Sequence, residues 1–398
     1  MTLANIERLA LRMDELGVDG LVATSLPNVC YLTGITSLSL SLGAPAAQCY
    51  AVVTRDRLAQ PHFVAARGEL DQAMDALPRL ASARGFGYFY REYPAGAELS
   101  EDERLLWQAE SAPAFAAAPA DALAQALRAA GLGAARVAID EHGAAAGLTA
   151  TLAEALPAAE FRPGADIFGW ARKVKTPEEI RRLAASAALT ERGIEAATAI
   201  VGPGVTERDL VREFDRTVAG EGGRPRFTLI KFGRSAVAGQ TAPGTRPLRR
   251  GEAIWFDVGC VLEGYWSDLS RVFSWGEPAD KLVRYHAAML AGQEHALREA
   301  RPGMPGKEVF QRTVQTVRES GVPHYRRQNV GHGIGAGLYD RVGLAPGVED
   351  LLEENTVLNI ETPYHEFGFG AVQVEDTFLV GATGNTLLTS LDRGLSVL

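Results

Sequence analysis

Five residues whose side chains are suited to metal binding lie within the last 142 residues of this 398-residue chain. Two aspartates eleven residues apart come first, then one histidine, then two glutamates fourteen residues apart: Asp257, Asp268, His332, Glu361 and Glu375. Carboxylates brought together without cations repel one another and raise each other's pKa. An oxygen-rich set with one imidazole suits two divalent ions, and it suits Mn²⁺ or Co²⁺ at least as well as Zn²⁺. Because two such ions close together turn water into a strong nucleophile, the residues predict metal-dependent hydrolysis.

Each pair of acids lies in sequence that is typical of an antiparallel hairpin. IWFDVGCV and YWSDLSRVF flank a possible turn at 262–264, and VLNIETPY and AVQVEDTFLV flank Gly368 and Gly370. A hairpin places the two acids of a pair side by side on one face. Apolar neighbours predict burial, which is costly for an acid unless a cation compensates its charge. The alternative is that the four acids are exposed or form salt bridges at strand ends. The glycines of GHGIG would let the backbone around His332 approach the same site.

Composition limits the partners that this chain can have. A net charge of −9 argues against nucleic acid or an anionic membrane surface as the main partner. Three widely spaced cysteines do not make a disulfide framework. The sequence has no apolar run long enough to span a membrane, and its first residues lack the pattern of a secretory signal. We therefore expect a cytoplasmic protein with a small-molecule substrate.

Two domains are expected from the length and from the order of helical and strand-like stretches. Residues 1–162 alternate apolar strand-like runs with helical patterns, which is typical of an α/β domain. Pro163 and Gly164 break this pattern, so the second domain is expected at residues 163–398. Near its start, TPEE has an N-cap threonine, a proline in the first helical position and the glutamate of a capping box.

The second domain contains a weak internal repeat. VGPGVTERDL at 201–210 resembles RPGMPGKEVF at 301–310, with an offset of 99 residues between the two Pro-Gly pairs. Each copy follows a predicted long helix, opens another, and precedes one of the two acid pairs. The alternative is coincidence, since Pro-Gly before a helix is common turn chemistry. We expect a duplicated α+β domain in which each half contributes one hairpin of ligands to a shared centre.

The ligand order resembles that of the pita-bread metallopeptidases of family M24, which include methionine aminopeptidase, aminopeptidase P and prolidase. RLALRMDELGVDGLVATSLPNVCYLTG near the N-terminus resembles the N-terminal domain of creatinase and prolidase, so the resemblance covers nearly the whole chain. It implies a pita-bread fold, a homodimer and a dinuclear centre. We expect Mn²⁺ as the metal, with Co²⁺ or Zn²⁺ as alternatives. Asp268 and Glu375 would bridge both ions. Asp257 would hold one ion, and His332 with Glu361 the other.

Positions around the ligands depart from the pattern of active prolidase-like enzymes. That pattern has histidines, an arginine and a tyrosine where this chain has Gln240, Gln328, Tyr339, His365 and Gln373. Glutamine can donate a hydrogen bond but cannot transfer a proton. The ligands are retained while their surroundings differ, which indicates either a new set of proton-transfer residues or a different substrate.

We predict a hydrolase that cleaves an amide bond of a small substrate, such as an Xaa-Pro dipeptide or an N-terminal residue. Glu361 is expected to act as the general base. The remaining candidates are His365 and Tyr339 for catalysis, and Gln240, Asp340 and Gln373 for substrate binding. One alternative is a non-peptidase enzyme that cleaves a C–N or C–X bond of a small metabolite, which the altered surroundings favour. Another is a binding protein that keeps only the fold, which the retained ligands oppose.

Overall fold

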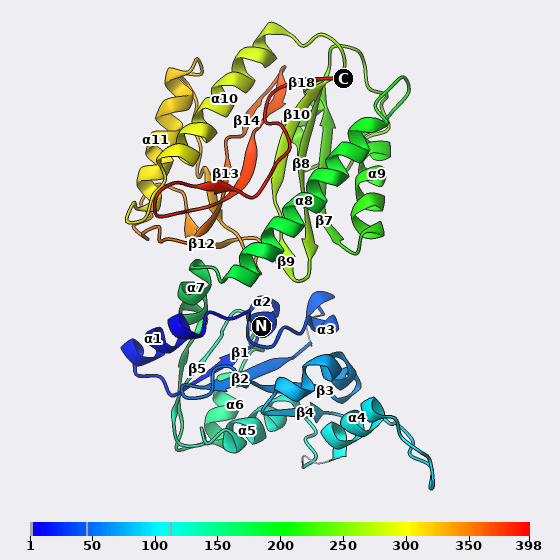
Figure 1. Cartoon of the computed structure of the whole chain (residues 1–398), viewed down its shortest axis with the longest axis vertical. Helices are drawn as coiled ribbons and strands as arrows, with labels where there is room; N and C mark the ends of the chain where they lie inside the picture. The colour runs from blue at the N-terminus through cyan, green and yellow to red at the C-terminus, as the bar shows by residue number, and fades with distance from the viewer. Residues whose placement is uncertain (1–2, 45–46, 112–113) are drawn as a thin grey trace. The chain divides into compact units, whose positions relative to one another are not determined.

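The computed structural model describes residues 3–44, 47–111 and 114–398 (Figure 1). Its contacts divide the chain into two compact units, Met1–Arg172 and Lys173–Leu398. No helix of the described residues is both long enough and apolar enough to cross a membrane.

The division lies ten residues later than the boundary expected after residue 162, because helix α7 (Ala165–Lys173) packs within the first unit. Arg12 of helix α1 forms an ion pair with Asp166 at 3.0 Å. The guanidinium carbon of Arg8 lies 3.7 Å from the ring centre of Trp170. Pro163 and Gly164 therefore mark a turn before the last helix of the first unit.

The first unit is built on a six-stranded mixed sheet in the order β4-β3-β2-β1-β5-β6. Its strands are β1 (Gly20–Ala23), β2 (Tyr50–Thr54), β3 (His62–Ala66), β4 (Ser82–Phe86), β5 (Arg136–Ile139) and β6 (Glu160–Pro163). Its helices are α1 (Ile6–Leu16), α2 (Leu26–Thr33), α3 (Leu38–Ser41), the 3-10 segment Arg67–Arg79, α4 (Glu101–Ser111), α5 (Pro119–Ala129), α6 (Leu148–Ala155) and α7. Buried valines of the strands pack against alanines and leucines of α5 and α6. The α/β pattern predicted for this part of the chain is confirmed.

The second unit is built on a ten-stranded sheet whose main order is β12-β11-β13-β16-β10-β8-β7. Its strands are β7 (Arg224–Phe232), β8 (Ala253–Leu262), β9 (Tyr265–Trp266), β10 (Leu269–Ser274), β11 (Gly331–Gly333), β12 (Asp340–Gly343), β13 (Val357–Glu361), β16 (Glu375–Leu379), β17 (Thr386–Leu387) and β18 (Ser396–Val397). A separate hairpin consists of β14 (Tyr364–Glu366) and β15 (Gly370–Val372). The helices are α8 (Pro177–Ala199), α9 (Glu207–Gly220), α10 (Asp280–Glu299), α11 (Gly306–Glu319) and the 3-10 turn Gly233–Ala238.

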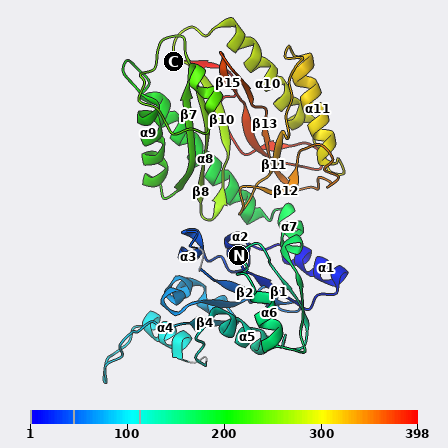
Figure 2. The same cartoon turned by 180° about the vertical axis from the view of Figure 1, so that it is seen from behind.

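The second unit consists of two similar halves, each a pair of helices on its own strands. One apolar core joins α8 and α9 to β7, β8 and β10, and another joins α10 and α11 to β13 and β16. Figure 1 shows α8 in front of the strands, and in Figure 2, seen from behind, the strands lie in front of α8. Helices α9 and α11 each have 14 residues.

The turns before these two helices also match. Gly204 and Gly303 both have positive φ, 86° and 85°, which favours glycine. An isolated antiparallel bridge follows each turn, between Thr206 and Pro247 in the first half and between Pro305 and Leu351 in the second. The duplicated α+β architecture predicted from the repeat is confirmed.

Candidate metal centre

The first acid pair lies on the antiparallel strands β8 and β10. Asp257 is in the middle of β8, and Asp268 immediately precedes β10. The connection turns through Glu263 and Gly264, whose φ values are 50° and 83°. This pair of left-handed residues suits the tight turn of a hairpin. The hairpin expected from the sequence therefore forms, with its turn at the expected residues.

The register of the sheet brings the two acid pairs together. Ser270 of β10 lies opposite Asp257 on one side and opposite Glu375 on the other. Glu375 in turn lies opposite Glu361 of β13. Residues directly opposite one another in antiparallel strands share a face. Three of the four acids, separated in sequence by as much as 118 residues, therefore lie in one row across the sheet.

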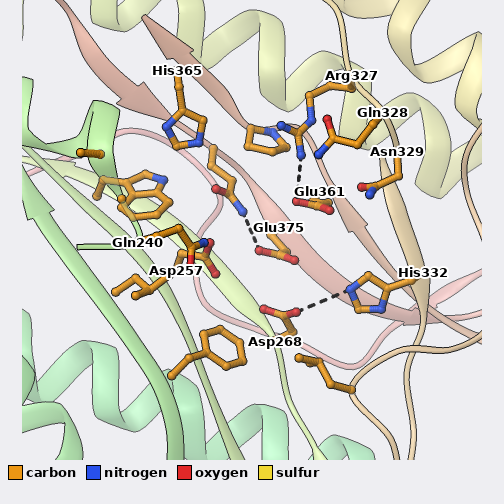
Figure 3. A pocket seen from close by; sticks show the side chains of 18 of the residues that line it. Gln240, Asp257, Asp268, Arg327, Gln328, Asn329, His332, Glu361, His365 and Glu375 are labelled. Atoms are coloured by element: carbon orange, nitrogen blue, oxygen red, sulfur yellow. Dashed lines mark hydrogen bonds and ion pairs between the residues drawn. The ribbon is translucent and has the colours of Figure 1, made fainter. Parts of the chain in front are cut away.

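His332 enters from the neighbouring strand β11, which pairs with β13. Its Nε2 lies 3.6 Å from Oδ2 of Asp268, and its Nδ1 lies 3.0 Å from the carbonyl oxygen of Gly333. Ligand atoms of Asp268, His332 and Glu375 lie within 4.8 Å of one another. Figure 3 shows these three side chains pointing toward a common centre, with Glu361 and Asp257 on either side.

The glycines on both sides of His332 permit this approach. Gly331 has a φ of 141°, and a side chain there would collide with the carbonyl oxygen of Asn359. A side chain on Gly333 would collide with the backbone of Arg341. The strand that carries the imidazole can therefore lie against its neighbours only because both positions lack a Cβ.

The electrostatics of the acids favour a bound cation. Burial raises the pKa of Asp257 and Glu375 well above the ordinary range, and the neighbouring acids raise it further. Burial also raises the pKa of Asp268 and Glu361. Burial disfavours protonation of His332, but the contact with Asp268 raises its pKa overall. Oδ1 of Asp268 is buried and has no hydrogen-bond partner among the described residues.

These properties fit a divalent cation. A buried carboxylate oxygen without a donor is costly, and two buried acids (Asp268 and Glu375) beside two half-buried ones (Asp257 and Glu361) are costlier still. Carboxylates with one imidazole are the donors that Mn²⁺, Co²⁺ and Zn²⁺ accept. The site opens into a cavity of about 810 Å³, whose walls include all five predicted ligands.

Comparison with known proteins agrees with this geometry. Residues 181–382, just over half of the chain, match the sequence profile of Metallopeptidase family M24. The protein belongs to this family. Residues 5–174 match the Creatinase/Prolidase N-terminal domain. The family and fold inferred from the ligand motifs are therefore confirmed.

Individual relatives of this M24 protein are distant. An uncharacterized peptidase of Staphylococcus aureus is 29% identical over 56% of this chain, and the matched region spans 64% of that relative. The Xaa-Pro dipeptidase from Bacillus anthracis shares the fold with a TM-score of 0.79, 22% identity and coverage of 99% of both chains. The X-Pro aminopeptidase from Thermotoga maritima has a TM-score of 0.76 and 20% identity, again over 99% of both chains.

All five outer positions that depart from the family pattern line the cavity of the M24 unit: Gln240, Gln328, Tyr339, His365 and Gln373. The ring of Tyr339 lies 4.6 Å from that of His332, centre to centre, and the residue is 74% exposed. Nδ1 of His365 lies 3.2 Å from the carbonyl oxygen of Ala236. Burial lowers the pKa of His365, which favours its neutral form. Gln240 stands on the wall near Asp257 (Figure 3).

Gln373 contacts the predicted ligands themselves. It is buried, and its Nε2 donates to Oε2 of Glu375 at 2.7 Å. It also forms a hydrogen bond with Asp257, which opposes the effect of burial on the pKa of that acid. Asn359 donates to the other oxygen of Glu375 at 2.5 Å. Gln373 therefore orients two of the acids, in addition to any contact with substrate.

Asp340 was expected to bind substrate, but it is not among the residues of the cavity wall. Its Oδ2 lies 3.1 Å from Nζ of Lys175, and the two side chains are 1% and 0% exposed. Lys175 immediately precedes the N-cap of α8, and it lies 165 residues from Asp340 in sequence. A buried ion pair of this kind is satisfied within the protein, so Asp340 is assigned to the structure of the second unit.

Arg327 also lines the cavity, although no sequence pattern predicted it as a site residue. Its Nη2 lies 3.7 Å from Oε2 of Glu361 (Figure 3). It follows Arg326 in a loop sequence, RRQN, that has no recognisable catalytic pattern. Only its distance of five residues from His332 could have drawn attention to it.

Proposed function

We propose that this M24 protein is a peptidase that hydrolyses an amide bond in a small substrate such as an Xaa-Pro dipeptide, with the help of two divalent ions. The observation that supports this most strongly is the convergence of four acids, two buried and two half-buried, and one imidazole on a cavity of substrate size. Mn²⁺ is the proposed metal. We also propose that the protein is a cytoplasmic homodimer, as the sequence resemblance implies.

The five ligands divide into a central and a peripheral group. Asp268, His332 and Glu375 form the closest cluster, so the two acids among them would contribute to holding both ions. Asp257 and Glu361 complete the site from either side. When bound, the ions would polarise the amide carbonyl and lower the pKa of a water molecule.

Glu361 is the proposed general base. It lies at the cavity wall, and its side chain is 17% exposed, whereas that of Asp268 is 8% exposed. Burial raises the pKa of Glu361, and the charge of Arg327 only partly opposes this effect. The net effect raises its pKa, which makes the carboxylate a stronger base for taking a proton from the attacking water and passing it to the leaving nitrogen.

His365 and Tyr339 are proposed to assist from the cavity wall. A neutral imidazole at His365 can accept or donate a hydrogen bond to the substrate carbonyl. The Tyr339 hydroxyl can donate one, since burial and then the nearby acids raise its pKa and keep it protonated. Gln373 holds the carboxylates of Asp257 and Glu375 in place during the reaction.

A second candidate is a non-peptidase reaction at a C–N bond of a small metabolite. The observation that favours it is the uncharged Gln240 and Gln373 on the cavity wall, neither of which can transfer a proton. This candidate uses the same ligands and the same base. It differs only in the group that the outer wall recognises.

The test is a cleavage assay of Mn²⁺-loaded protein with Xaa-Pro dipeptides beside non-peptide amides. We expect cleavage of at least one dipeptide, and we expect Glu361→Gln to reduce kcat by roughly 100-fold or more, as loss of a general base does. Cleavage of non-peptide amides alone would favour the second candidate. Cleavage of neither group would contradict the proposed hydrolysis.

A further inference from the structure

His365 reaches the cavity from a hairpin that is separate from the main sheet (Figure 3). Strands β14 and β15 form a two-stranded sheet of their own, between Glu361 at the end of β13 and Glu375 at the start of β16. Because successive side chains of a strand point to opposite faces, Tyr364 and Glu366 face away from His365. One face of β14 therefore belongs to the cavity wall, and the contacts of its other face determine how firmly the strand is held.

The face of β14 away from the cavity carries a continuous chain of hydrogen bonds. The hydroxyl oxygen of Tyr364 lies 2.7 Å from Nε2 of His324 and 2.7 Å from Oε2 of Glu366. The other oxygen of Glu366 accepts a hydrogen bond from Nζ of Lys281 on α10. The contacts with Lys281 and then Tyr364 lower the pKa of Glu366, which favours its ionised form. The chain therefore joins the loop after α11, the hairpin and α10.

The direction of these hydrogen bonds follows from the donors that are available. A tyrosine hydroxyl has one hydrogen, and an ionised carboxylate only accepts. Tyr364 therefore donates to Glu366, and the Nε2–H group of His324 donates to the Tyr364 oxygen. Hydrogen bonds to a charged group are the stronger kind, and bonds in a chain polarise one another. The Tyr364 hydroxyl is the link through which His324 and Glu366 are connected.

Aromatic packing surrounds the same residues. The ring centre of Tyr285 on α10 lies 5.3 Å from that of Tyr364 and 5.6 Å from that of Phe369. Nζ of Lys281 lies 5.0 Å from the ring centres of both Tyr285 and Phe369. The substitution Tyr364→Phe keeps the aromatic ring in this cluster, so it removes the hydrogen bonds of the hydroxyl without creating a cavity.

We propose that Tyr364 is a positioning residue for His365: its hydrogen bonds fix β14 against α10 and so direct the imidazole on the opposite face toward the substrate. This inference rests on the proposed function, in which His365 assists from the cavity wall. The ring centre of His365 lies 5.8 Å from that of Trp255, and its Nδ1 lies 3.2 Å from the carbonyl oxygen of Ala236. Because a hydrogen bond weakens steeply when its geometry is lost, a small displacement of β14 would remove the contact with Ala236.

A simpler account is that the other strand alone fixes the hairpin. Gly370 of β15 lies against the 3-10 turn, since a side chain there would collide with the carbonyl oxygen of Gly233. In that case Tyr364 contributes only to stability, and its loss has the same effect whether or not His365 is present. If Tyr364 acts through His365, its loss has no further effect once His365 is absent. A double-mutant cycle separates the two accounts.

The experiment measures kcat and KM of Mn²⁺-loaded wild type, Tyr364→Phe, His365→Gln and the double variant, with the substrate that the cleavage assay identifies. We expect Tyr364→Phe to lower kcat by roughly 10-fold, the effect of one hydrogen bond to a charged group, and to change KM by less. The double variant should match His365→Gln. An unchanged kcat in Tyr364→Phe, or a further 10-fold loss in the double variant, would overturn the proposal while the proposed hydrolysis stands.

A second measurement does not depend on catalysis. NMR of Zn²⁺-loaded protein with isotope-labelled histidine follows the titration of the His365 ring, whose signals are assigned by their absence in His365→Gln. Burial lowers the pKa of His365 in wild type. In Tyr364→Phe the ring should enter solvent, and its pKa should rise toward the ordinary value of about 6.5. An unchanged titration would overturn the proposal even if no substrate is cleaved.

The other end of the chain offers a matched pair of variants on α10. Lys281→Met removes the cation that holds Glu366, so it should change kcat and the His365 titration in the same direction as Tyr364→Phe. Arg284→Met removes an exposed cation three residues further along the same helix, and it should behave as wild type in both measurements. Equal changes in Lys281→Met and Arg284→Met would show an effect of general charge and would contradict the proposed chain.

Discussion

Replacement of Asp268 by asparagine is expected to have opposite effects on stability with and without metal. In the metal-free protein the carboxylate faces other buried acids, and its Oδ1 has no described partner. Asparagine is nearly isosteric and uncharged, so the substitution removes repulsion without creating a cavity. The metal-free Asp268→Asn protein should therefore be more stable than metal-free wild type.

The magnitude follows from the separation of the charges. Ligand atoms of Asp268 and Glu375 lie within 4.8 Å of each other. At an effective dielectric constant of about 20, two full charges at that distance repel by about 3.5 kcal/mol. Partial protonation of the acids lowers this figure, so we expect a gain of about 1–3 kcal/mol. For a unit of this size, each kcal/mol raises Tm by roughly 2–4 °C.

The pH dependence has a definite sign. Because burial raises the folded-state pKa of the clustered acids, the folded state binds more protons than the unfolded state above about pH 4. Metal-free wild type therefore loses stability as pH rises from there through the folded pKa values. The Asp268→Asn substitution also removes the ion pair with His332, and this loss lowers the stability of the variant at pH values where the imidazole is protonated. The gain from Asp268→Asn should accordingly grow with pH.

Urea unfolding in chelator at pH 5 and pH 8, and then with excess Mn²⁺, measures these effects. Saturating metal should stabilise wild type by about 4 kcal/mol at 1,000 times Kd, and the variant by much less. Asp376→Asn is the control, because that buried acid is already paired with Arg271 at 2.5 Å and its loss should destabilise both forms. A variant that is less stable than wild type in chelator at pH 8 would refute the reasoning.

Three further predictions concern residues around the ligands. Arg271→Met should lower the free energy of unfolding by about 3–5 kcal/mol, because its buried carboxylate partner is left unpaired. It should also weaken Mn²⁺ binding roughly 10-fold or more, since Arg271 donates to the Glu375 carbonyl. Unchanged urea midpoints and Mn²⁺ titrations would contradict this. Lys175→Met should lower the free energy of unfolding, measured in urea, by about 3–5 kcal/mol through the loss of its pair with Asp340. KM should stay unchanged, and an altered KM would support a role of Asp340 in substrate binding. The double substitution Gln240→His and Tyr339→His should lower turnover of the native substrate by roughly 10-fold or more. Faster turnover in a steady-state assay would show that these two positions are not adapted to a different substrate.

The convergence of the five proposed ligands on one site could be predicted from the sequence, because the signals that position them are local. Three of the acids lie in apolar strands and Asp268 immediately precedes one, so the strands and the faces that carry the acids can be predicted from the neighbouring residues. The turn residues at 262–264 predicted the hairpin, and the repeated Pro-Gly pair predicted the duplication, because both signals are also local in the sequence. The start of α8 was predicted because Thr176 and Glu179 form a capping box within four residues.

The surroundings of the ligands could not be predicted because they depend on distant contacts. Asp340 was expected to bind substrate, but it forms a buried ion pair with Lys175, which lies 165 residues away in the sequence. Gln373 was assigned to substrate from its position, whereas its amide bonds to the ligands through the register of the sheet. Arg327 lies on a loop without periodicity, and only the packing of its neighbours directs it into the cavity.

The metal content of the protein tests the central claim most directly. Wild type and Asp268→Ala, purified without chelator and equilibrated with Mn²⁺ by dialysis, can be compared by elemental analysis. We predict about two ions per chain in wild type, as expected for a two-metal site, and markedly fewer in the variant, which has lost a bridging ligand. A wild-type stoichiometry near zero after loading would contradict the metalloenzyme account, and an unchanged stoichiometry in Asp268→Ala would show that Asp268 does not bridge the ions.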